Sequence, residues 1–116
     1  MSATTIGLDR SGSAAILRIA GDVTSGSEAE LMAGFNRAID DGASAVVLDF
    51  TAMEYMNSGG IGLLVTLLVR AQRGGARLLA TGLSDHYRQI LSLTRIDEAI
   101  EIYDDETAAV AAAAEC

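Results

Sequence analysis

The sequence has few of the residues on which metal sites, disulfides and much enzyme chemistry depend. Its single cysteine is the last residue, Cys116, so neither an internal disulfide nor a cysteine-based zinc site can form. His86 is the only histidine, and nothing around it resembles a catalytic signature. Proline is absent, which excludes cis prolyl bonds. We therefore expect no metal, no cofactor and no enzymatic activity.

Basic residues and long apolar runs are also scarce. Eight Lys and Arg against 16 Asp and Glu give a net charge of −8, which disfavours a nucleic-acid partner because such binding depends on basic side chains. The longest apolar run, Ile61 to Val69, is interrupted by Thr66 and is too short to span a bilayer. The N-terminus has no basic region followed by an apolar run. We expect a cytoplasmic protein with no membrane partner.

Aromatic residues make up only 4% of the chain, although half of its residues are apolar. The core must therefore consist mainly of Ile, Leu, Val, Ala and Met. A chain of 116 residues is long enough to bury such a core and has the size of one domain. We expect a single domain over residues 1–116, as a monomer or weak dimer.

The first 42 residues predict a hairpin and a helix. Thr5 to Asp9 and Ala14 to Ala20 have the character of strands, and a turn at Ser11 to Ser13 separates them. Ser27 and Glu30 form a capping-box pattern that opens a helix. The apolar stripe of this helix recurs every four residues and ends before a glycine: Leu31, Phe35, Ile39 and Gly42.

The rest of the chain alternates between strands and helices. Ala45 to Phe50 is a continuous apolar run, typical of a central strand covered on both faces. The further elements are expected as a helix from Ser58 to Arg73, a strand from Arg77 to Thr81, a helix capped by Ser84, a strand from Ile100 to Tyr103 and a last helix starting at Asp104 to Glu106. The order β-β-α-β-α-β-α-β-α predicts an α/β fold with a mixed, mostly parallel β-sheet and four helices.

One segment, Tyr55 to Gly62, carries the strongest functional signal. We expect a loop there, joining a strand to a helix at the carboxyl edge of the sheet, where binding sites usually lie. Asn57 or Ser58 can cap the helix, and the helix start favours an anion. The segment lacks the lysine and spacing of a P-loop. The residues alone leave two interpretations open: a binding loop, or a capped helix whose glycines allow tight packing.

The helix after this segment has apolar residues on both of its faces. One face is sufficient for the core and holds Ile61, Leu64, Val65 and Leu68. The other carries Leu63, Thr66 and Val69, and it is more apolar than contact with solvent requires. This excess indicates a protein partner or cover by a neighbouring helix. On this assignment, a glutamate is tolerated at Leu63 and damages folding at Leu64.

Three motifs resemble the STAS domain, which is found in sulphate transporters and anti-sigma factor antagonists. They are Gly21 to Thr24, Val46 to Phe50 and Met56 to Gly62, and the likeness runs from about Thr5 to Ala109. The resemblance implies a partner switch, in which the antagonist binds an anti-sigma factor, usually also a serine kinase, and thereby releases a sigma factor. It also implies that phosphate on a Ser or Thr at the start of the second helix stops this binding.

The chain departs from the family pattern at the phosphoacceptor. The family loop usually reads Asp-Ser-Ser-Gly or Asp-Ser-Thr-Gly, and here these positions are Asn57, Ser58, Gly59 and Gly60, so the acceptor hydroxyl is absent. Three interpretations remain: the chain binds without being phosphorylated, Ser58 accepts the phosphate instead, or Gly59 is an engineered replacement. Gly59→Ser is expected to restore an acceptor at little structural cost.

The partner surface implied by the resemblance is expected to combine the second-helix start with a neighbouring loop. Its residues are Asp22, Thr24, Asn57, Ser58, Gly59, Gly60, Leu63 and Thr66. The expected partner is an anti-sigma factor or serine kinase protein. Two alternatives stay open: a stressosome-type or transporter-associated scaffold of the same fold, and a small nucleotide- or anion-binding module that uses the helix start.

Overall fold

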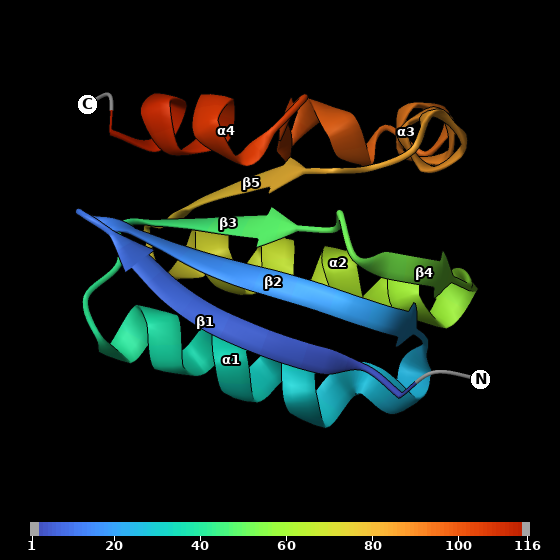
Figure 1. The fold of residues 1–116 in the computed structure, drawn as a ribbon, viewed down its shortest axis with the longest axis horizontal. Coiled ribbons are helices and arrows are strands. Elements are labelled where there is room, and N and C mark those ends of the chain that lie inside the picture. Colours follow the sequence, from blue (N-terminus) through green and yellow to red (C-terminus); the bar gives the residue numbers. More distant parts are fainter. Residues whose placement is uncertain (1–2, 115–116) are drawn as a thin grey trace.

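The computed structural model describes residues 3–114, and in it a six-stranded sheet carries helices on both faces (Figure 1). Cys116 lies outside the described residues. The strands are β1 (Thr5–Ser11), β2 (Ala14–Val23), β3 (Ala45–Asp49), β4 (Met53–Met56), β5 (Arg77–Thr81) and β6 (Glu101–Tyr103). The helices are α1 (Glu28–Asp40), α2 (Ser58–Arg73), α3 (Asp85–Leu93) and α4 (Glu106–Ala113), with short 3-10 turns η1 (Ser25–Ser27) and η2 (Ile96–Glu98).

The sheet is mixed and mostly parallel, as the sequence predicts. Its order is β1-β2-β3-β5-β6, and β4 pairs with the end of β2. Only β1 runs antiparallel, as the first half of the predicted hairpin, and every other pairing is parallel. The carboxyl ends of the parallel strands therefore lie at one edge, and the loops before α1 and α2 begin there (Figure 1).

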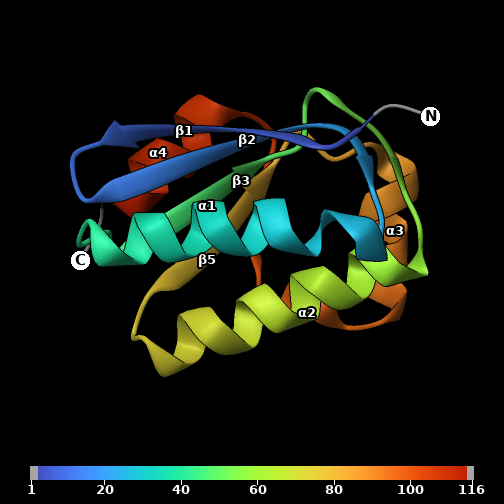
Figure 2. The same cartoon turned by 90° about the horizontal axis from the view of Figure 1, so that it is seen from below.

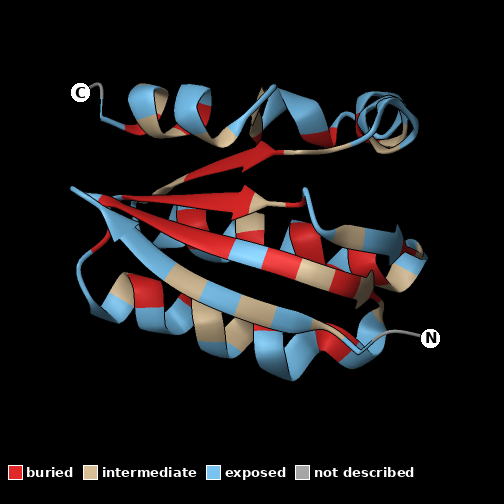
Figure 3. Ribbon diagram, in the orientation of Figure 1, coloured by how far each residue is buried: buried red, intermediate tan, exposed pale blue. Residues whose placement is uncertain are grey.

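The core lies in two layers, one on each face of the sheet. The larger layer packs α1 and α2 against one face, and a smaller one packs α4 against the other (Figures 1 and 2). The central strand β3 serves both layers, because Val46 and Leu48 belong to the larger layer and Val47 to the smaller one. Figure 3 shows β3 buried along most of its length. The predicted central strand is therefore confirmed.

The sequence did not predict β4, and the segment around Tyr55 was expected to be a loop. Instead β4 pairs in parallel with the last residues of β2, with Gly21 opposite Met53 and Val23 opposite Met56. β4 is only four residues long and has just one buried side chain, Met56, so it has no alternating apolar pattern. β2 is correspondingly longer than predicted, because it continues through Gly21 to Val23.

The predicted capping box of Ser27 and Glu30 is wrong. The capping box forms one turn earlier, where the Thr24 hydroxyl accepts from Gly26 N and Ser27 Oγ accepts from Thr24 N at 3.0 Å. Ser27 is the N-cap residue of α1 but makes no side-chain cap bond there. The reason is that its hydroxyl is already engaged in the preceding 3-10 turn. Gly42 ends this region as expected, with φ at +89° just beyond α1.

Candidate functional site

Two loops far apart in the sequence meet at one end of the molecule. The first runs from the end of β2 into η1 and includes Asp22, Thr24 and Ser25, and the second runs from the end of β4 into the first turn of α2 and includes Asn57, Ser58 and Gly59. We call these six residues the two-loop surface. The amide nitrogen of Asn57 donates to the carbonyl oxygen of Val23 at 3.2 Å, which ties one loop to the other. Figure 2 shows the start of α2 beside the blue segment that precedes α1.

Asn57 is the N-cap of α2. Its backbone is extended, with φ −102° and ψ −175°, and its side-chain Oδ1 accepts a hydrogen bond from Gly60 N at 3.0 Å. This bond satisfies an amide that the first turn of a helix leaves without a partner. The structure thereby decides between the two predicted caps, because Ser58 is the first helical residue and is exposed.

The two glycines at the start of α2 allow the loops to touch. A Cβ atom on Gly59 would lie 2.8 Å from the backbone nitrogen of Ser25 and 3.0 Å from the Ser25 Cβ. A Cβ on Gly60 would clash with the carbonyl oxygen of Val23 and lie 2.8 Å from Met56 Cγ. These contacts support the packing interpretation of the glycines. They also contradict the expectation that Gly59→Ser has little structural cost, since the backbone of Ser25 would have to move.

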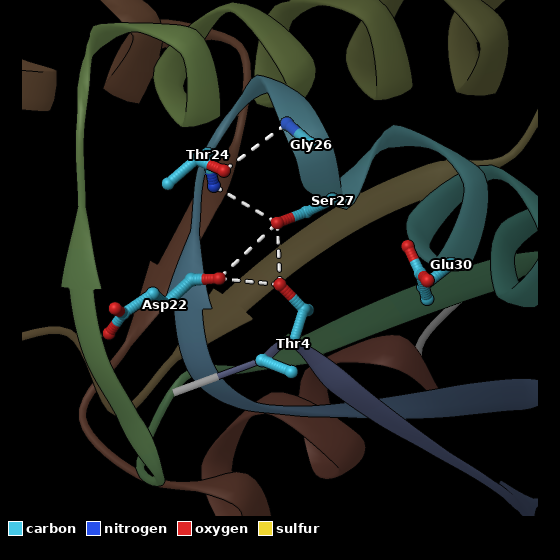
Figure 4. Close-up of a pocket in the computed structure, with 7 residues that line it drawn as sticks. Thr4, Asp22, Thr24, Gly26, Ser27 and Glu30 are labelled. Atoms are coloured by element: carbon cyan, nitrogen blue, oxygen red, sulfur yellow. Dashed lines mark hydrogen bonds between the residues drawn. The ribbon is translucent and has the colours of Figure 1, made fainter. Parts of the chain in front are cut away.

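A hollow of about 330 Å³ adjoins the first loop (Figure 4). Thr4 Oγ1 and Ser27 Oγ lie 2.5 Å apart, and both lie within hydrogen-bonding distance of the Asp22 carbonyl oxygen. Ser27 is only 2% exposed. These hydrogen bonds hold the loop in place. The hollow is lined by Ala3, Thr4, Asp22, Thr24, Gly26, Ser27 and Glu30.

The charge around the hollow is negative. Asp22 and Glu30 contribute carboxylates to its lining, and Glu28 follows at the start of α1. No basic side chain is among the residues that line it. An anionic ligand in the hollow would therefore meet unfavourable carboxylates.

The predicted faces of α2 are wrong at two positions, Leu63 and Val65, whereas Leu64 is buried in the core as predicted. Leu63, expected on the outer face, is only 5% exposed and belongs to the core. Val65, expected in the core stripe, is 41% exposed, and Val69 is equally exposed, as predicted for the outer face. Thr66 is exposed as predicted, and its hydroxyl donates back to Gly62 O at 3.1 Å. The buried positions of the helix are Gly60, Leu63, Leu64, Leu67 and Ala71.

Two residues of the expected partner surface are buried. Gly60 is buried under Val23, and Leu63 is buried in the core, so neither offers a side chain to a partner. The exposed apolar face of α2 carries Val69, as predicted, and Val65 in place of Leu63. Asp22, Thr24, Asn57, Ser58, Gly59 and Thr66 remain partly or fully exposed.

Tyr87, for which the sequence predicts no contact, holds β4 in place. The hydroxyl oxygen of Tyr87 on α3 accepts a hydrogen bond from the amide nitrogen of Met56 at 2.9 Å. This bond supports the strand immediately before Asn57. The sequence does not predict this bond, because no local pattern relates a single tyrosine at a helix start to a distant backbone amide. His86 packs edge-on against the Tyr87 ring and is exposed.

The ion pairs of Arg18 and Arg77 involve no residue of the two-loop surface. Arg18 on β2 pairs with Glu106 at 2.7 Å and with Asp9 at 3.3 Å, and Arg77 pairs with Glu101 at 2.6 Å. Hydrogen bonds from Arg77 hold the pKa of the Glu101 carboxyl below its usual value. Burial raises the pKa of the Asp49 carboxyl, but hydrogen bonds from Thr51 contribute to lowering it, and the net shift is downward.

The part of the chain that the structure describes offers no candidate metal centre. None of its His, Cys, Asp and Glu side chains form a group of three or more that could hold an ion. Within residues 3–114, no helix combines the length and apolar character needed to cross a membrane.

Comparison with known proteins identifies the fold. The STAS domain family model matches residues 5–109. An anti-sigma factor antagonist from Mycobacterium paratuberculosis superimposes with a TM-score of 0.84 at 17% identity, covering 97% of this chain and 96% of that one. The Bacillus cell fate determinant SpoIIAA in its phosphorylated form gives 0.71 at 17% identity, with 93% and 99% covered.

A third similar structure belongs to a protein that is not named as an anti-sigma factor antagonist. A sulfate transporter family protein from Wolinella succinogenes superimposes with a TM-score of 0.76 at 21% identity, covering 87% of this chain and 84% of that one. At such low identities these likenesses show the shared fold.

Proposed function

The chain belongs to the STAS domain family, and we propose that within this family it acts as an anti-sigma factor antagonist, which binds an anti-sigma factor and so releases a sigma factor. The antagonist from Mycobacterium paratuberculosis supports this proposal, since it shares the fold over nearly the whole of both chains. The proposal describes a regulatory protein that binds another protein in the cytoplasm and catalyses no reaction.

The observation that carries the proposal is the locking of two loops into one exposed surface. The Asn57 amide bonds to Val23, Asn57 caps α2, and Gly59 packs directly on the backbone of Ser25. Each contact restricts the loops before a partner arrives, so less conformational freedom is lost on binding. A surface held in this way suits recognition by a protein.

The apolar part of the proposed interface lies on α2, next to the two-loop surface. Val65 and Val69 are four residues apart and therefore lie on one side of the helix, with Thr66 between them in sequence. Their exposure gives the interface an apolar centre, while Asp22 and Ser58 supply a polar rim. The acidic hollow beside it favours a partner with basic side chains at its own rim.

Residue 59 does not accept phosphate in this proposal. The Bacillus structure shows that a protein of this fold can carry a phosphate. The family pattern puts the acceptor at Gly59, which has no hydroxyl, and the closeness of Ser25 leaves no free space for a side chain there. Binding is therefore independent of any kinase that acts on residue 59.

Calorimetric titration with purified anti-sigma factors of the source organism tests the binding step. We expect one of them to bind the chain with a Kd in the micromolar range or tighter. Ser58→Arg, which adds bulk and charge to the two-loop surface, is expected to weaken this binding at least tenfold. Ser13→Arg is the matched control, because Ser13 is exposed in the β1–β2 turn at the other end of the sheet. Equal binding by both variants would contradict the proposed surface.

Titration with ATP, GTP and inorganic phosphate tests the alternative of a nucleotide- or anion-binding module. We expect no heat of binding, because the segment from Tyr55 to Gly62 holds no Lys or Arg and the chain carries a net charge of −8. A micromolar Kd for any of the three would favour the alternative over the proposal. A scaffold of the stressosome or transporter type would bind its partner without releasing a sigma factor.

A further inference from the structure

Ser25 of the first loop lies beside Gly59 of the second loop, which has no side chain. Ser25 Cβ is 3.0 Å from the place that a Cβ on residue 59 would take. The Ser25 side chain is exposed, and none of the hydrogen bonds in the described part of the chain uses its hydroxyl. We propose that Ser25 is the phosphoacceptor of this protein and that phosphate on it blocks partner binding. This inference rests on the proposed function and names the regulation of the same surface.

The other hydroxyls of this loop are engaged in holding it together. Thr24 Oγ1 accepts from Gly26 N at 3.2 Å, and Ser27 Oγ accepts from Thr24 N at 3.0 Å. Thr4 bonds to the carbonyl oxygen of Asp22. Phosphate on any of these three oxygens would break a bond that shapes the loop. Ser25 can be modified without such a loss.

Ser58 is the rival acceptor, because it is also exposed and lies next to residue 59 in the sequence. It begins α2, however, and successive side chains of a helix point about 100° apart. A hydroxyl on Ser58 therefore does not replace one on residue 59, although the two residues are neighbours. Ser25 reaches that place from the other loop, which makes it the better substitute in space.

The modification is an ordinary phosphoryl transfer from a nucleoside triphosphate, catalysed by a serine kinase. The Ser25 Oγ attacks the γ-phosphorus, a new O–P bond forms, and the bond from the γ-phosphorus to its bridging oxygen breaks. The nucleoside diphosphate leaves, and the hydroxyl proton passes to a base on the kinase. No oxidation or reduction takes place.

Phosphate at Ser25 would change the charge of the surface strongly. It adds about −1.5 to −2 charges at pH 7. The residues that line the adjacent hollow include Asp22 and Glu30 and no basic side chain, so nothing there neutralises the new charge. A partner that approaches the two-loop surface would meet added bulk and an unpaired phosphate. Binding is expected to be lost without any change in the fold.

Peptide mapping can separate Ser25 from Ser58 because the chain contains arginine but no lysine. Trypsin, cutting after arginine, places Ser25 on the peptide of residues 19–37 and Ser58 on the peptide of residues 38–70. The wild-type protein and Ser25→Ala are incubated with Mg-ATP and extract of the source organism, from growing and from stationary cells. We expect one phosphate on peptide 19–37, assigned to Ser25 by fragmentation, and none after Ser25→Ala. Phosphate on Ser58 alone, or on neither peptide, would overturn the proposal.

A second measurement tests the effect on binding. Phosphoserine is incorporated at position 25 and, as a control, at position 13, and each protein is titrated against the anti-sigma factor that binds the unmodified chain. We expect the Kd to rise at least tenfold for position 25 and less than twofold for position 13, with Ser25→Ala binding as wild type does. An unchanged Kd with phosphoserine at position 25 overturns the proposal about Ser25 alone. A failure of the unmodified chain to bind any anti-sigma factor overturns the proposed function instead.

Discussion

Gly60 packs directly against the carbonyl oxygen of Val23, so that the first turn of α2 lies on the end of β2 with no side chain between them. This contact brings the two loops together and fixes where α2 begins. It also explains why Gly60 is buried in the first turn of α2 although it has no apolar side chain.

Gly60→Ala is expected to destabilise the protein by about 1–3 kcal/mol, the usual cost of overpacking a filled site. Gly62→Ala is the matched control, because Gly62 lies in the same helix and a Cβ there meets no atom within 4 Å. The free energy of unfolding of that variant should rise by about 0.5–1 kcal/mol, because alanine has a higher helix propensity than glycine. Urea denaturation measures both. Equal stability of the two variants would show that the loops do not touch as described.

Gly59→Ser is expected to destabilise the chain by about 1–3 kcal/mol, since its Cβ would meet the backbone nitrogen of Ser25 at 2.8 Å. Adding Ser25→Gly should recover only part of this loss, because it removes the Cβ contact and leaves the backbone contact. Denaturation of the single and double variants provides the comparison. Wild-type stability for Gly59→Ser would mean that the loop moves freely.

Leu63→Glu should impair folding, whereas Val65→Glu should impair partner binding. Leu63 is buried, so a glutamate there is expected to cost about 3–5 kcal/mol, as an uncompensated buried charge does. Val65 is 41% exposed, and Val65→Glu should change stability by less than about 1 kcal/mol while weakening partner binding. Thermal unfolding and calorimetry measure the two effects. A more stable Leu63→Glu than Val65→Glu would reverse the assigned faces of α2.

Stability is expected to fall in acid partly through Glu101. Its pKa is lower in the folded protein than in the unfolded chain because Arg77 donates hydrogen bonds to it. Its contribution is therefore complete above the unfolded pKa of about 4.3 and is lost as the pH falls through the folded pKa. The pair is partly exposed, so the effect should stay below about 1 kcal/mol.

Urea midpoints of wild type and Glu101→Gln between pH 6 and pH 3 test this expectation. The difference between the two proteins should shrink as the pH falls. If the difference in urea midpoint grew toward pH 3, the pKa of Glu101 would be raised by folding and not lowered.

The sequence predicts well those elements that carry their own local pattern. β3 is recognisable because its apolar run is unbroken, and the start of α2 is recognisable because Asn57 and Ser58 both favour a helix cap. β4 is missed because only one of its four residues is buried. Its place depends instead on pairing with the end of β2 and on a bond to Tyr87, both far away in the sequence.

The faces of α2 could not be assigned from periodicity alone. Apolar residues occupy most positions from Ile61 to Val69, so several choices of face fit the pattern almost equally well. The true stripe includes Gly60, whose burial leaves no apolar side chain to reveal it. The nearness of Ser25 to residue 59 is likewise a contact between distant parts of the chain, and no spacing rule predicts it.

Release of a sigma factor tests the central claim most directly. A purified complex of the sigma factor with the anti-sigma factor that binds this chain is mixed with wild-type protein, Ser58→Arg or Ser13→Arg, and free sigma factor is measured by size-exclusion chromatography. Wild type and Ser13→Arg are predicted to release the sigma factor stoichiometrically, and Ser58→Arg to release little. A complex that stays intact at saturating wild-type protein, although the anti-sigma factor binds the chain, would contradict the account.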